Sequence, residues 1–135
     1  MDRELTISLK VAAGYLVIVG MVGIVWPLLG LGPHHPEFEA QSLGYKIGAY
    51  AREHTINILF LVSGIVIFMK RNWGRKLALV VLVVSTIYTS NAFAWSYAQG
   101  EPTQQIRLVA LAIIGAWNGI WFFLLVRRSS REALA

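Results

Sequence analysis

The sequence of 135 residues predicts an all-α integral membrane protein, a bundle of four transmembrane helices with both termini in the cytoplasm. Three observations predict this fold. Hydrophobic residues make up 56% of the chain and charged residues 14%, whereas soluble domains carry about a quarter charged residues. Four apolar runs approach the length that spans a bilayer, and the cations cluster at their ends. We therefore expect one transmembrane domain over residues 1–135.

The first apolar run covers about residues 11–31 and contains no charged residue. It is longer than the apolar part of a signal peptide and lacks a cleavage signature, so we expect it to be retained as a helix. Gly20, Gly23, Pro27 and Gly30 follow at spacings of three, four and three residues, which places them on one face. Small residues on one face let a neighbouring helix approach closely, so this stripe is predicted to be a packing surface.

Residues 32–54 form the longest connection, and we expect them to lie on the outer side as an amphipathic segment before the second helix. His34, His35 and His54 occur here with several glutamates. Imidazole and carboxylate groups are ligands for zinc, copper or nickel, so an outer metal or redox site is one hypothesis. The spacing matches no established ligand motif, and a hydrated loop with a charged helix start is the alternative.

The second helix is expected over about residues 49–69. Its purely apolar part, residues 55–69, spans roughly 22 Å of a hydrocarbon layer of roughly 30 Å, so the helix must begin further upstream. Two arrangements fit this requirement. One is a single long helix from about Glu37, and the other, which the glycines favour, is an amphipathic helix that bends into the membrane at Gly44 or Gly48.

A basic turn separates the second and third runs and sets the predicted orientation. With the two termini it holds nine lysines and arginines, against three on the opposite side. Cations near helix ends favour the cytoplasmic side, so we expect both termini in the cytoplasm. The expected location is the plasma membrane, which in bacteria is the inner membrane. This distribution indicates lipid headgroups and not nucleic acid as the anionic partner. The cations expected at the headgroups are Lys70, Arg71, Arg75, Lys76, Arg127 and Arg128.

The third and fourth helices are expected over about residues 77–98 and 106–126, joined by a short turn that contains glycine and proline. Each carries a further stripe of small residues on one face. These stripes are predicted to pack against neighbouring helices. Their members include Ser85, Thr89, Gly115 and Gly119.

Uncharged polar side chains gather in the outer parts of the second and third helices. An amide in hydrocarbon needs a hydrogen-bond partner, so these groups must face protein or water. Hydrogen bonds between helices explain them in one interpretation. In the other they line a pocket for a ligand or a lipid headgroup, open to the outside. The candidate pocket residues are Asn57, Tyr88, Ser90, Asn91 and Trp95.

The fourth helix carries an aromatic face with Trp117, Asn118 and Trp121. The two tryptophans are four residues apart and therefore share one side of the helix. This face is predicted either to point into lipid or to form an interaction surface for another helix.

The four apolar cores contain no acidic, basic or histidine residue, and the chain has no cysteine. An ionisable residue in the membrane is the usual mark of a pump or proton path, and haem bundles need internal histidines. No catalytic motif occurs, so we expect no enzyme activity and no cofactor. The favoured function is a non-catalytic accessory subunit that packs on a partner membrane protein or on its own copies. The alternatives are an oligomeric carrier or channel for a neutral or lipidic molecule, and an outer-face metal or redox protein.

Overall fold

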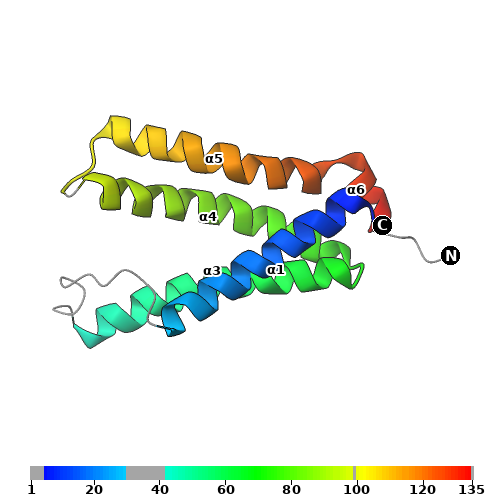
Figure 1. Cartoon of the computed structure of the whole chain (residues 1–135), viewed down its shortest axis with the longest axis horizontal. Helices are drawn as coiled ribbons and strands as arrows, with labels where there is room; N and C mark the ends of the chain where they lie inside the picture. The colour runs from blue at the N-terminus through cyan, green and yellow to red at the C-terminus, as the bar shows by residue number, and fades with distance from the viewer. Residues whose placement is uncertain (1–4, 30–41, 99, 135) are drawn as a thin grey trace.

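The computed structural model describes residues 5–29, 42–98 and 100–134, and this part of the chain is helical and contains no strand. The predicted all-α class is confirmed. The helices are α1 (Ile7–Leu28), α3 (Leu43–Phe68), α4 (Asn72–Ala98), α5 (Gln104–Val126) and α6 (Arg128–Ala133) (Figure 1).

Three of these helices, α1, α4 and α5, are long and apolar enough to cross a membrane. The apolar stretch of α3 is shorter, over His54–Phe68, because its amino-terminal half carries Lys46, Arg52 and Glu53. Large apolar side chains also point outward along all four long helices, as lipid-facing residues do. These features identify a helical membrane protein.

The chain is helical without interruption from Leu43, through Gly44 and Gly48, to Phe68. The Ser42 side chain starts α3, because its oxygen accepts a hydrogen bond from the Tyr45 backbone N–H at 3.3 Å. A glycine weakens a helix by about 1 kcal/mol but does not by itself end one. The described part of the amphipathic segment and the apolar stretch are therefore parts of one helix, whereas the start expected near Glu37 lies outside the described residues.

The long helices form two pairs, α1 with α3 and α4 with α5. In the first pair α1 crosses α3, and in the second the helices run side by side in opposite directions (Figure 1). The pairs are joined mainly by the packing of α3 on α4, whereas α1 and α5 touch only over a short stretch.

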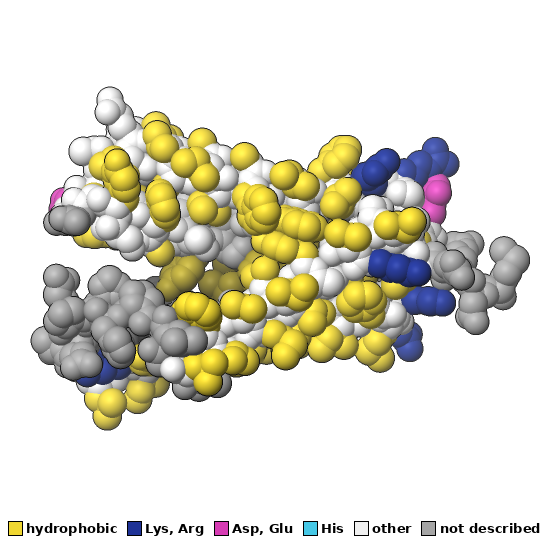
Figure 2. All heavy atoms as spheres, viewed as in Figure 1, with side chains coloured by type: hydrophobic (Ala, Val, Ile, Leu, Met, Phe, Trp, Pro, Cys, Tyr) yellow, Lys and Arg dark blue, Asp and Glu magenta, His cyan; other side chains and the backbone are white. Residues whose placement is uncertain are grey.

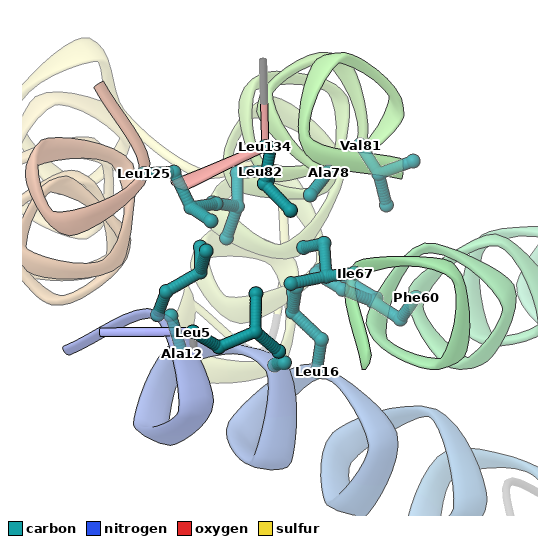
Figure 3. Packing of buried hydrophobic residues seen from close by; sticks show 12 residues of the cluster. Leu5, Ala12, Leu16, Phe60, Ile67, Ala78, Val81, Leu82, Leu125 and Leu134 are labelled. Atoms are coloured by element: carbon teal, nitrogen blue, oxygen red, sulfur yellow. The ribbon is translucent and has the colours of Figure 1, made fainter. Parts of the chain in front are cut away.

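The hydrophobic core lies at the end of the molecule that carries both chain termini (Figures 1 and 3). Its larger members come from the amino-terminal halves of α1 and α4, the carboxyl-terminal halves of α3 and α5, and the chain ends. They are Leu5, Leu9, Leu16, Phe60, Ile67, Leu82, Leu125 and Leu134. At the opposite end the two helix pairs diverge, and the molecule is hollowed between them (Figure 2). This divergence positions the candidate site.

A tight turn with a strained residue joins α3 to α4. The Lys70 backbone N–H donates to the Ile67 carbonyl at 2.8 Å, and that of Arg71 donates to the Val66 carbonyl at 3.1 Å. These two bonds form a Schellman motif, which satisfies the last carbonyls of the helix. Lys70 occupies its left-handed position with φ of 57°, where a side chain other than glycine costs free energy.

We expect Lys70→Gly to stabilise the protein by about 1 kcal/mol, because glycine removes the Cβ that opposes the left-handed conformation. Thermal unfolding in detergent, followed by circular dichroism, measures this change. Lys76→Gly is the control, since Lys76 lies inside α4 and glycine there should destabilise by about 1 kcal/mol. A destabilised Lys70→Gly protein would contradict the strained turn.

Candidate functional site

A cavity of about 310 Å³, here called the central cavity, lies where the two helix pairs diverge. All four long helices contribute to its wall. The lining residues are Tyr15, Val19 and Gly23 of α1, Ile56, Asn57 and Phe60 of α3, Ser85, Tyr88 and Thr89 of α4, and Ile114, Trp117 and Asn118 of α5. Small-molecule sites have volumes of roughly 300–1,000 Å³. The central cavity therefore has the volume of a small ligand site.

Each long helix places one aromatic ring in this wall: Tyr15, Phe60, Tyr88 and Trp117. Each also contributes at least one uncharged polar group, a hydroxyl, an amide or an indole N–H. Among the described residues that line the cavity, none is charged. The wall thus combines stacking surfaces with hydrogen-bonding groups and lacks an ionic partner.

An aromatic cluster ties α1 to α5 at one side of the central cavity. The rings of Tyr15 and Trp121 stack with 3.9 Å between centroids and 6° between planes. Trp117 meets both rings edge-on, and its Nε1–H donates a hydrogen bond to the Tyr15 hydroxyl oxygen at 3.0 Å. The aromatic face that the sequence predicted on the fourth helix therefore contacts another helix of the same chain. Trp117 is nevertheless 55% exposed, so this contact leaves part of its ring accessible.

Asn118 connects α5 to α4 on the neighbouring side of the cavity. Its amide N–H donates to the Thr86 hydroxyl oxygen at 2.8 Å, and that hydroxyl donates to the Leu82 carbonyl at 2.7 Å. The side chain is 9% exposed. Within the described part of the chain its amide oxygen and second N–H form no hydrogen bond. Asn118 lines both the central cavity and a second hollow between α4 and α5.

Asn57 reaches the cavity from α3, opposite the small residues of α1. Its side chain lies against Gly23, where any added Cβ would overlap the amide group. Among the described residues this amide has no hydrogen-bond partner. The absence of a side chain at Gly23 is thus what gives Asn57 its place in the wall.

The structure brings only two of the five candidate pocket residues, Asn57 and Tyr88, into one cavity. The Ser90 hydroxyl donates to the Thr86 carbonyl at 2.6 Å, and the exposed Asn91 amide donates to the Ile87 carbonyl at 3.0 Å. Both bonds stay within α4, which satisfies these polar groups without a ligand. Trp95 is exposed near the end of α4 and does not line the cavity. Ser90 is buried in the protein but outside this cavity, whereas Asn91 and Trp95 lie on the exposed side of α4.

Tyr15 is the main cavity residue that the sequence analysis missed. Its position four residues before Val19 and eight before Gly23 places it on the stripe that continues along α1. A tyrosine within an apolar run, in line with a small-residue stripe, is the signal that could have found it. Trp117 and Asn118 were identified for an interaction surface, and Ser85 and Thr89 for packing, before the structure placed them in the cavity wall.

The predicted packing residues behave differently in α1 and α5. A Cβ at Gly20 would lie 2.6 Å from the Leu61 backbone nitrogen of α3, and one at Gly23 would overlap the Asn57 side chain of the same helix. By contrast, a Cβ at Gly119 would meet open space, with no atom within 4 Å, and one at Gly115 would meet only a Thr86 methyl group at 3.8 Å. Pro27 lies in the last turn of α1, and Gly30 falls outside the described residues.

The histidines do not form a metal site within the described residues, where no group of three potential ligands occurs. His34 and His35 lie outside the described ranges. His54 is on α3, with its ring parallel to that of Tyr50 at 6.2 Å between centroids. Its Nδ1 is buried and has no hydrogen-bond partner in the part of the chain that the structure describes.

Lysine and arginine side chains gather at the end that carries the termini (Figure 2). Five of the six cations expected at lipid headgroups are exposed there: Lys70, Arg71, Lys76, Arg127 and Arg128. Arg75 is a correction to that expectation, because it is 8% exposed and bonds to protein. Its Nε donates to the Asn72 side-chain oxygen at 3.0 Å and its Nη1 to the Leu125 carbonyl at 3.3 Å. Folding brings the carboxyl end of α5 next to α4. A backbone carbonyl of α5 thus accepts the hydrogen bond from Arg75 that a lipid headgroup was expected to accept.

Comparison of the chain with protein-family models, curated proteins and solved structures finds no match. The functional argument therefore depends on the geometry described above.

Proposed function

We propose that the protein is a non-catalytic integral membrane protein that binds an uncharged, amphipathic small molecule in the central cavity. The observation that carries this proposal is that all four helices direct aromatic and uncharged polar groups into one cavity. Clefts with apolar walls and a few polar groups are the usual form of small-molecule sites. The described lining residues include no histidine, cysteine, lysine or acid, so they favour binding over acid–base or nucleophilic chemistry. A carrier for a neutral or lipidic molecule is the corresponding cellular role.

We further propose that all four long helices span the plasma membrane, the bacterial inner membrane, with both termini in the cytoplasm. The support is the basic end of the molecule and the length of α3, whose 26 residues extend roughly 39 Å. In this orientation the central cavity opens toward the outer side.

The orientation predicts which ends of the molecule accept a label from outside the cell. The chain has no cysteine, so single cysteines at the exposed positions Glu101 and Ser129 can be labelled selectively. We expect Glu101→Cys to react with an impermeant maleimide in intact cells, and Ser129→Cys to react only after permeabilisation. Labelling of Ser129→Cys in intact cells would contradict the proposed orientation.

The binding proposal predicts that a small molecule co-purifies with the protein. We expect native mass spectrometry from mild detergent to detect an added mass on the wild-type protein. Asn57→Leu, which keeps the shape of the side chain but removes its amide, should lose that mass. Asn91→Leu is the matched control, since Asn91 lies outside the cavity wall and should retain it. If Asn57→Leu kept the added mass as well as Asn91→Leu does, a ligand in the central cavity would be contradicted.

A second candidate function, an accessory subunit that packs on a partner membrane helix or a second copy, is favoured by a different surface. A groove of about 300 Å³ runs between α4 and α5, with Gly115 and Gly119 in its wall. These glycines make little or no contact with the described residues, although such residues usually serve close helix packing. The same mass measurement tests this function, because a co-purifying chain would replace the small molecule. Gly119→Leu should then release that chain without unfolding the protein.

A further inference from the structure

The four rings around the central cavity point to a flat ligand. Tyr15, Phe60, Tyr88 and Trp117 come from four different helices, so the bundle surrounds the cavity with aromatic surface on several sides. Aromatic rings bind planar groups by offset stacking or edge-to-face contact. An acyl chain without a ring could not form these stacking or edge-to-face contacts.

The uncharged donors around the cavity point to a ligand with acceptor atoms. Tyr15 accepts a hydrogen bond from Trp117, and within the described residues its own hydroxyl hydrogen has no acceptor. Asn57 and Asn118 each keep at least one amide N–H without a protein partner there. These three donors come from α1, α3 and α5. In apolar surroundings such donors are stabilised by acceptors such as carbonyl oxygens.

The absence of charge among the described lining residues argues for a neutral ligand. An anion would find no lysine or arginine in this wall, and a cation would find no carboxylate. A cation could still bind over the aromatic faces, as quaternary ammonium groups do in aromatic cages. Burial of a cation without a counter-charge is costly, however, and the unpaired N–H and O–H donors would face it unfavourably. An uncharged ring satisfies the stacking surfaces and the donors together.

The side of the central cavity between α1 and α5, beside the aromatic cluster, is closed by few helix contacts. The half-exposed Trp117 lies where α1 and α5 meet over only a short stretch. A tail that leaves the cavity at this point enters the lipid. The ring can therefore remain in the cavity while the chain stays in hydrocarbon.

We propose that the ligand of the central cavity belongs to the quinone class, an uncharged planar ring with two carbonyl acceptors and an apolar tail. This inference builds on the proposed binding function and names its ligand class. Tyr15, Asn57 and Asn118 donate hydrogen bonds to the ring oxygens, while the aromatic side chains enclose its faces and edges. Binding involves no electron or proton transfer.

Tryptophan fluorescence in lipid nanodiscs tests this assignment. Trp26, Trp73 and Trp95 are replaced by phenylalanine, so that emission comes from the two tryptophans of the aromatic cluster. Decylubiquinone is the probe, and we expect saturable quenching. Tyr15→Phe and Asn57→Leu should each weaken binding by about tenfold, the effect of one lost hydrogen bond. Asn91→Leu should leave the affinity unchanged.

Competition with three other probes separates the ligand classes. Phenyldecane has a ring without acceptors, monoolein has an acyl chain without a ring, and benzyldimethyldecylammonium has a ring with a cation. We expect none of them to displace the quinone at equal concentration. Quenching that does not saturate, or that Tyr15→Phe and Asn57→Leu leave unchanged, overturns the quinone assignment. Displacement by phenyldecane or monoolein also overturns it but leaves the binding of an uncharged molecule intact. Displacement by the ammonium probe overturns both the quinone assignment and the proposed binding of an uncharged molecule. If no probe binds and no co-purifying mass is found, both proposals fail.

Discussion

Gly20→Leu is expected to separate α1 from α3 and to destabilise the protein by about 3 kcal/mol. A Cβ at this position would lie 2.6 Å from the Leu61 backbone nitrogen and 2.7 Å from the Asn57 carbonyl oxygen. Both are backbone atoms of α3, which cannot move aside without moving the helix. Close packing is a principal source of association between helices in lipid, so this loss is not offset by other contacts.

Thermal unfolding in detergent, read by circular dichroism, measures the effect, and Gly14→Ala on the same helix is its control. No atom lies within 4 Å of a Cβ at Gly14, so alanine should stabilise by up to about 1 kcal/mol through its higher helix propensity. The two variants thus have expected effects of opposite sign. Equal stability of Gly20→Leu and the wild-type protein would contradict the α1–α3 contact.

Gly20→Leu should also change the central cavity, because it displaces a helix that lines the cavity. Gly20 and Gly23 both lie against the part of α3 that carries Asn57. A displaced α3 would withdraw that amide from the cavity wall, so Gly20→Leu should lose the co-purifying ligand as well as stability. Gly14→Ala should keep both.

The sequence predicted the helices of this fold well, because apolar runs and their charged ends depend on local composition. It also placed Gly20 and Gly23 on one face of the first helix, and in the structure a Cβ at either glycine would meet atoms of α3, which could not be named in advance. Gly115 and Gly119 carry the same pattern yet contact little within the chain. A small-residue stripe shows that a close approach is possible, but it does not show which helix, if any, makes that approach.

The candidate site was harder to predict, because it depends on how each helix is rotated about its axis. Asn57 and Asn91 were equivalent in the sequence, as single amides in the outer parts of two apolar runs. Packing turned Asn57 into the cavity, whereas Asn91 bonds to its own helix. α4 is apolar around much of its surface, so its sequence does not indicate which side faces the other helices. Tyr15 and Trp117, separated by 102 positions, meet only in the folded bundle.

Arg75 shows the same dependence on tertiary structure and carries the second large expected effect. Arg75→Met should destabilise the protein by about 2 kcal/mol, because it removes two hydrogen bonds made by a buried cation. One of these bonds reaches the Leu125 carbonyl in the last turn of α5, at 3.3 Å. A cation at a helix carboxyl end also interacts favourably with the helix dipole. The Ser130 hydroxyl donates to the preceding carbonyl, that of Leu124, at 2.6 Å. The side-chain donor to the Leu125 carbonyl is therefore Arg75.

Lys76→Met is the matched control for this substitution, followed by the same unfolding measurement. It removes one cation from the same turn, and so changes the charge balance that orients the chain by the same amount. Lys76 is exposed, however, and its loss should change stability by no more than about 0.5 kcal/mol. Arg75→Lys should fall between the two, since one ammonium group cannot reproduce the two-sided contact of the guanidinium. If Arg75→Met and Lys76→Met were equally stable, Arg75 would act only as a topological charge, and its contact with α5 would contribute nothing to the fold.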